Sequence, residues 1–220
     1  RGDSYFYQMV VKNFVENGNL NVNAQLGAPG QQELYDFPLT HSMHLLAWVV
    51  LRLFTNNYGL VINLYYLLTY PLSAITALYV FRKFGIPPEL AMAGGILFAF
   101  LPFHLLRGQY HLMLSSYYIV PLMIMVLLWV STAVPLFRFE VPQTSPFRPI
   151  VTKRGIISII VCVLIASDNP YNAFFAGVLV LAAGVIACFR RGSRRSLLSS
   201  GILGLTLAIA LFCNLIPNFL

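Results

Sequence analysis

Two polar segments of this sequence carry side chains that can move protons and bind anions. Asp3 lies near the start of the first segment, and His104, Arg107 and His111 lie in the second. These last three stand at positions i, i+3 and i+7, which would place them on one face of a helix. A carboxylate can act as a general base toward a hydroxyl group, and an arginine with imidazole groups can bind a phosphate or pyrophosphate. The residue types therefore indicate proton transfer beside a phosphate group.

The same residues also have purely structural interpretations. Asp3 can cap a helix predicted from Ser4 to Asn17. Arg107 can reach lipid headgroups, with the histidines as interfacial polar residues. Gly108 lets the helix break before His111, which would weaken the shared-face argument. The sequence alone leaves both interpretations open.

A further candidate is Asp168, in the polar segment Ser167-Asp168-Asn169-Pro170-Tyr171-Asn172. The sequence Asp-Asn-Pro strongly favours a turn, so the only role of this carboxylate can be to stabilise that turn. It could instead bind an acceptor, a metal ion or a positively charged partner.

The composition is that of an integral membrane protein. Hydrophobic residues make up 58% of the 220 residues and charged residues 10%, against roughly 25% charged residues in a soluble domain. Six apolar segments, most of them near the ~20 residues that a helix needs to cross a bilayer, are Tyr58 to Phe81, Leu90 to Leu106, Leu112 to Val134, the shorter Ile156 to Ala166, Phe174 to Phe189 and Leu197 to Ile216. We therefore predict an all-α integral membrane protein in which residues 58–220 form a multi-span helical bundle.

The basic residues indicate how the chain threads the membrane. Ten of them fill the loops after the first, third and fifth apolar segments: Arg82, Lys83, Arg138, Arg148, Lys153, Arg154, Arg190, Arg191, Arg194 and Arg195. Lys and Arg mark cytoplasmic loops, so we predict that these loops lie inside and that Asp3, Asp168 and all four histidines lie outside. The net charge of +7 then reflects orientation and contact with anionic lipids, and we expect no nucleic-acid partner.

Residues 1–57 are predicted to form a large external loop with two surface helices. The first runs from Ser4 to Asn17, where apolar residues recur at helical spacing. The second runs from Thr40 to Phe54, because treating this segment as a span would place the ten basic residues outside. Secondary candidates for acceptor binding in this loop are Tyr35, Asp36 and His41. We also expect a preceding span and a further C-terminal portion.

This layout resembles the GT-C superfamily of polytopic membrane glycosyltransferases, which take sugars from polyprenyl-phosphate or related lipid carriers. Members have a first span, a large external loop with two juxtamembrane helices and an acidic catalytic residue near its start, and then alternating spans. Here Gly2-Asp3 opens the loop, the two predicted surface helices follow, and six spans complete the chain. The resemblance covers essentially the whole chain, as a pattern more than as a motif.

The resemblance implies an inverting transfer of a hexosyl or pentosyl group to a glycan, lipid or protein acceptor. Asp3 would take the proton of the acceptor hydroxyl, Arg107 with His104 or His111 would stabilise the leaving lipid phosphate, and Asp168 could orient the acceptor. The reaction would occur on the non-cytoplasmic side of a prokaryotic inner membrane and build a cell-envelope glycan. The second external loop lacks the D-x-D or E-x-D pair of better-defined members, which leaves a divalent metal requirement and the subfamily open.

The main alternative is a polytopic transporter or a flippase of lipid-linked sugars without catalysis. Such proteins carry ionisable residues or broken helices near the middle of the membrane. The predicted spans contain Asn63, Asn214, Pro71 and Pro121 but no charged residue. The sequence therefore favours the enzyme over the transporter.

Overall fold

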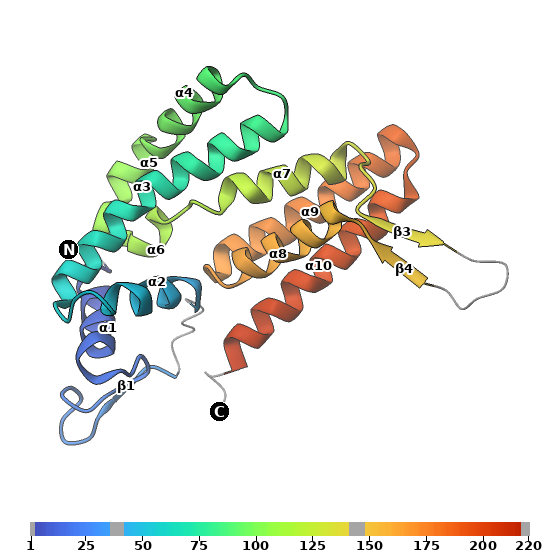
Figure 1. Ribbon diagram of the computed structural model, residues 1–220. Coiled ribbons are helices and arrows are strands. Elements are labelled where there is room, and N and C mark those ends of the chain that lie inside the picture. The colour runs from blue at the N-terminus through green and yellow to red at the C-terminus, as the bar shows by residue number, and fades with distance from the viewer. Residues whose placement is uncertain (1–2, 36–41, 141–147, 217–220) are drawn as a thin grey trace. The chain divides into compact units, whose positions relative to one another are not determined.

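The computed structural model describes residues 3–35, 42–140 and 148–216, most of which are helical (Figure 1). The elements in chain order are α1 (Ser4–Asn17), β1 (Val22–Asn23), β2 (Gln32–Glu33), α2 (Ser42–Arg52), α3 (Tyr58–Lys83), α4 (Pro88–Ala99), α5 (Pro102–Arg107), the 3-10 helix η1 (Gly108–His111), α6 (Leu112–Ser115), α7 (Val120–Ser131), β3 (Phe137–Glu140), β4 (Arg148–Val151), α8 (Lys153–Ala166), α9 (Pro170–Arg191) and α10 (Arg194–Leu215). Two small antiparallel hairpins, β1–β2 and β3–β4, interrupt the helices. The sequence pattern did not predict these hairpins.

Four helical segments within the described residues are long and apolar enough to cross a membrane. They are Tyr58–Lys83, Pro88–Ser115, Pro170–Arg191 and Arg194–Leu215. Their length and composition support the predicted helical membrane protein. The sequence predicts six spans, and the difference lies in the third and fourth of them.

The third predicted span is interrupted between α6 and α7. Pro121 falls in the first turn of α7, where the missing N–H leaves no intrahelical bond unmade, so it begins this helix and does not kink a longer one. The helix has 12 residues and α8 has 14, which at 1.5 Å per residue gives about 18 and 21 Å, less than the ~30 Å of a hydrocarbon core. In the described part of the chain, four long helical segments, one of them composed of α4, α5, η1 and α6, and the two short helices α7 and α8 therefore replace the six expected spans.

The chain divides into two compact units, Arg1–Pro121 with Leu215–Leu220, and Leu122–Asn214. In the first unit α3 and α4 form an antiparallel pair, and α1 and α2 pack against α3 (Figure 1). The pair approaches closely at Gly95, where an added Cβ atom would lie 2.6 Å from the carbonyl oxygen of Ala74. Helices α1 and α2 are thus packed with α3 and α4 in one compact unit.

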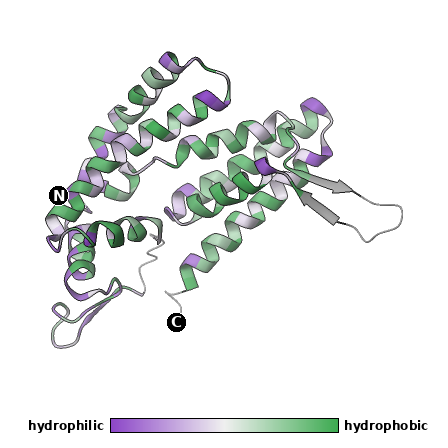
Figure 2. Ribbon diagram, in the orientation of Figure 1, coloured by the Kyte–Doolittle hydropathy of each residue, from purple (hydrophilic) through white to green (hydrophobic). Residues whose placement is uncertain are grey.

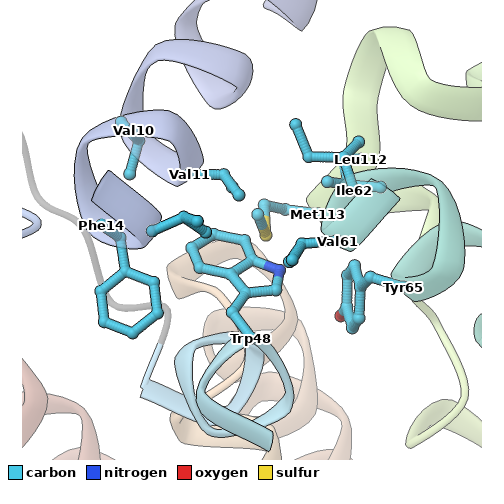
Figure 3. Packing of buried hydrophobic residues seen from close by; sticks show 10 residues of the cluster. Val10, Val11, Phe14, Trp48, Val61, Ile62, Tyr65, Leu112 and Met113 are labelled. Atoms are coloured by element: carbon cyan, nitrogen blue, oxygen red, sulfur yellow. The ribbon is translucent and has the colours of Figure 1, made fainter. Parts of the chain in front are cut away.

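The core of the first unit forms where α1, α2, α3 and α6 meet. Trp48 of α2 is 1% exposed, and Figure 3 shows its indole ring with Val11 of α1 and Met113 of α6 beside it. The buried members of this cluster are Val10, Val11, Phe14, Val15, Trp48, Val61, Ile62, Tyr65, Leu112 and Met113. The apolar face of α1 is therefore covered by protein.

Helix α2 has one face buried in the core and a second, apolar face that is exposed. Trp48 and the neighbouring His44 are buried, whereas Leu46, Val49 and Val50 are exposed. An exposed apolar face on a helix that ends in Arg52 is typical of a helix at a membrane surface. The placement of α1 and α2 at that surface stays a prediction.

The second unit contains most of α7 together with α8, α9 and α10. Residues 167–169 connect α8 to α9, and Gly192 (φ 63°) turns the chain from α9 into α10. Cations begin α8, end α9 and begin α10, and they therefore gather at one end of this unit: Lys153, Arg154, Arg190, Arg191, Arg194 and Arg195. In both units the hydrophilic residues lie mainly toward the helix ends (Figure 2).

Replacing the central tryptophan should destabilise the first unit. We expect Trp48→Ala to lower the free energy of unfolding by about 3–5 kcal/mol, because it leaves a large cavity among α1, α2, α3 and α6. Leu46→Ala is the matched control, since Leu46 lies on the same helix and is 64% exposed. Denaturant titration in detergent micelles measures both variants. Equal effects would show that Trp48 does not organise this core.

A single added methyl group should separate α9 from α10. A Cβ atom at Gly184 would lie 2.0 Å from the hydroxyl oxygen of Ser200, whereas one at Gly177 of the same helix would meet nothing within 4 Å. We expect Gly184→Ala to cost about 1–3 kcal/mol through overpacking, and Gly177→Ala to be neutral or slightly stabilising. Thermal unfolding in micelles distinguishes the two, and a neutral Gly184→Ala would contradict this packing.

Candidate functional site

The first unit brings Asp3 and His111 into direct contact across 108 positions of sequence. Oδ2 of Asp3 accepts a hydrogen bond from Nδ1 of His111 at 3.0 Å. Asp3 stands at the N-cap position of α1, but its side chain makes no capping hydrogen bond. The Asp3 side chain therefore does not cap the helix, because its carboxylate contacts His111 of η1 instead.

This contact has a defined chemical consequence for the histidine. A carboxylate that accepts from Nδ1–H favours the tautomer in which Nε2 carries the lone pair, and it also stabilises the ring once it is protonated. Among the described residues, Nε2 of His111 has no hydrogen-bond partner. The Asp3 side chain is 59% exposed and that of His111 31%, so the pair is open to a substrate.

A hollow of about 460 Å³ lies beside the pair. Its lining residues are Phe103, Leu106, Arg107, Tyr110 and His111. The Arg107 guanidinium lies 5.5 Å from the centre of the Phe103 ring, and within the described part of the chain no carboxylate pairs with it. A free guanidinium, an imidazole and three apolar or aromatic side chains suit a ligand that joins an anionic group to an apolar chain.

Two hydrogen bonds and a ring stack hold the His104 side chain inside the protein and away from the hollow. Its ring is fully buried, Nδ1–H donates to the carbonyl of Ala99 at 2.9 Å, and Nε2 lies 2.8 Å from Oγ1 of Thr69. The ring also stacks on Tyr70 with centroids 3.9 Å apart. His104 satisfies a carbonyl group at the end of α4, which is a structural task.

The expectation that His104, Arg107 and His111 share one helical face is corrected by the structure. Helix α5 ends at Arg107, and Gly108 takes a φ of +48°, a value that L side chains rarely adopt. The chain then continues as η1, which Gln109 ties to α3 through a 2.6 Å hydrogen bond from its Nε2 to Oδ1 of Asn63. The break separates His104 and Arg107, which belong to α5, from His111 in η1.

The remaining predicted candidates fall elsewhere. Asp168 is 1% exposed, and its Oδ2 accepts from the side-chain amides of Asn169 at 3.1 Å and Asn172 at 2.5 Å, which fits its role in the α8–α9 turn. It belongs to the second unit, and its role beside Asp3 stays a prediction. Tyr35 is exposed in a turn after β2. Asp36 and His41 lie outside the described residues.

Sequence reasoning missed two features of this site. The contact between Asp3 and His111 could not be read from the sequence, because no local spacing links residues so far apart. Phe103 and Tyr110 flank Arg107 within the same polar segment, and this alternation of aromatic and cationic residues was the available signal. Among the described residues, no group of three or more His, Cys, Asp or Glu side chains could hold a metal ion.

Replacement of His104 and replacement of His111 should change the free energy of unfolding by different amounts. We expect His104→Ala to lower the free energy of unfolding by about 1–3 kcal/mol, because it removes buried hydrogen bonds to the carbonyl of Ala99 and to Thr69, and it also loses the stacking on Tyr70. His111→Ala should cost about 0–1 kcal/mol, since its hydrogen bond to Asp3 is exposed to solvent. Chemical denaturation in micelles measures both. A larger loss for His111→Ala would reverse the two roles.

None of the protein-family models, curated proteins or solved structures with which the chain was compared matches it.

Proposed function

We propose that this protein is a membrane glycosyltransferase that moves a sugar from a polyprenyl-phosphate donor to an acceptor hydroxyl group. The observation that carries this proposal is the Asp3–His111 pair beside a hollow that also contains Arg107. A proton acceptor and an unpaired guanidinium are the two groups that such a transfer requires from the protein. The resemblance in layout to the GT-C superfamily supplies the substrate class.

In the proposed reaction the acceptor oxygen attacks the anomeric carbon and the bond from that carbon to the phosphate oxygen breaks. The lipid phosphate leaves with the bonding electron pair, and Arg107 stabilises its growing negative charge. The acceptor proton passes to the Asp3–His111 pair, in which Asp3 holds Nδ1–H and Nε2 accepts. His111 thereby joins Asp3 in proton acceptance, while Arg107 retains the role in phosphate binding.

The position of the pair within the first unit supports this proposal. Val61, Ile62 and Tyr65, from the first turns of α3, lie in the core that holds α1, and Arg82 and Lys83 lie at the other end of the same helix. A helix of 26 residues is about 39 Å long. We therefore propose that the pair faces the non-cytoplasmic side if the basic residues face the cytoplasm.

Removal of the carboxylate tests the proposed function. In the complete protein, Asp3→Asn should lower sugar transfer from a polyprenyl-phosphate donor by about 10²–10⁴-fold, the usual contribution of a general base. Glu16→Gln is the matched control, because Glu16 is an exposed carboxylate of the same helix that pairs with Lys12 at 3.4 Å. Unchanged transfer in Asp3→Asn would remove this pair from catalysis.

A double variant shows whether the two residues act as one unit. If they do, His111→Gln should cause a loss similar to that of Asp3→Asn, and the double variant should lose little more. Additive losses would separate the two roles and return His111 to phosphate binding.

A flippase of lipid-linked sugars is the second candidate, and one observation favours it. The candidate span Pro88–Ser115 is broken after α4 and again at Gly108, and broken helices are typical of transporters. Vesicles loaded with a labelled polyprenyl-phosphate sugar distinguish the two functions. Movement of the label between leaflets without sugar transfer, unaffected by Asp3→Asn, would favour the flippase.

A further inference from the structure

A second hollow, of about 540 Å³, lies at the basic end of the second unit. It is lined by Ser131, Thr132, Ile186, Arg190 and Arg191. Ser131 is the last residue of α7 and Thr132 follows it, and the other three residues come from the last turns of α9. Its volume is that of a small-molecule site, and both arginine side chains are exposed.

The charges around this hollow are not balanced within the chain. Residues Leu122–Asn214 contain eight basic residues and two acidic ones, Glu140 and Asp168. Among the side chains that the structure describes, no ion pair involves Arg190 or Arg191. The neighbouring cations of α8 and α10 lie in first turns that carry no acidic residue, where the helix dipole already favours anions. An anion from outside the chain would relieve this repulsion.

The two hydroxyl groups that line the hollow favour a ligand that carries hydrogen-bond donors. Oγ of Ser131 donates to the carbonyl of Leu128 at 3.1 Å, and Oγ1 of Thr132 donates to the same carbonyl at 2.5 Å. Their hydrogens are thereby used, but their oxygens retain lone pairs that accept hydrogen bonds. The hollow therefore combines two cationic forks for a phosphate with two acceptors for hydroxyl groups of the ligand.

Apolar residues beside the hollow point to a lipid as the source of the phosphate. Phe189 is 86% exposed, and Ile186 and Val185 are 48% and 42% exposed on the same helix. This helix, α9, is one of the four that are long and apolar enough to cross a membrane. A ligand whose phosphate enters the hollow can lay its acyl chains along this face.

We propose that this hollow binds the headgroup of an anionic phospholipid, in which a phosphate diester contacts Arg190 and Arg191 and headgroup hydroxyls donate to Ser131 and Thr132. Phosphatidylglycerol has this chemistry. The site shares no residue with the Asp3–His111 pair and does not depend on the proposed glycosyl transfer.

Native mass spectrometry of the intact protein in mild detergent tests the proposal. Short-chain phosphatidylglycerol, phosphatidylcholine and inorganic phosphate are the three probes. We expect one phosphatidylglycerol to bind at least about tenfold more tightly than phosphatidylcholine, and Arg190→Gln/Arg191→Gln to remove this preference, since each basic residue near anionic lipid contributes to binding. Arg82→Gln/Lys83→Gln is the matched control, because it removes the same charge at a helix end of the first unit.

Three results would overturn the proposal. Equal affinity for the two lipids would show that the arginines do not select an anionic headgroup. Equal loss in both double variants would reduce the effect to general surface charge. Binding of inorganic phosphate without phosphatidylglycerol would assign the hollow to a soluble anion and not to a lipid. Circular dichroism of both variants checks that they fold, and substitution of exposed arginines is expected to preserve the fold.

Discussion

The packing around Trp48 is the interaction on which the first unit depends. Its indole ring lies where α1, α2, α3 and α6 meet, and no other described tryptophan occupies that unit. Helix α1 is amphipathic and too short to be stable alone in water, so its position follows from this burial. The residue at its N-cap is Asp3, and the residue before α6 is His111. The core that fixes α1 against α6 therefore also fixes the distance between the two groups of the candidate site.

A second constraint is the demand of the backbone for hydrogen bonds in apolar surroundings. The break after α4 leaves carbonyl groups without helical partners, and such groups are costly where water is excluded. The Tyr117 hydroxyl donates to the carbonyl of Phe98 at 2.7 Å, and His104 donates to that of Ala99. These bonds stabilise the break, and the break in turn lets α5 and η1 present Arg107 and His111 to the hollow. His104 therefore stabilises the fold around the break, whereas His111 lines the hollow.

Charge is distributed unevenly between the helix ends of each unit. In the first unit, the Asp3–His111 pair lies toward the start of α3, while Arg82 and Lys83 end that helix. In the second unit, Asp168 lies in the α8–α9 turn. Lys153 and Arg154 begin α8, Arg190 and Arg191 end α9, and Arg194 and Arg195 begin α10. The membrane orientation predicted from the loops stays a prediction. The charge distribution also gives each unit cationic groups that can bind an anion, a substrate phosphate in the first unit and a lipid headgroup in the second, as proposed above.

The sequence by itself determined the helical membrane character, the long apolar helices and the clustering of basic residues, because these depend on composition and on local periodicity. It also identified Asp3, Arg107 and His111 as residues capable of chemistry. It could not separate His104 from His111, since both are histidines in one polar segment and only tertiary packing buries the first against Thr69 and Tyr70. Nor did it shorten the third and fourth spans, because Ser and Pro residues such as Ser115, Ser116 and Pro121, which lie at the break before Val120, are also tolerated within continuous membrane helices. The tertiary structure decided that Asp3 meets His111, because a contact between residues 108 positions apart arises from the packing of whole helices and leaves no trace in the local pattern.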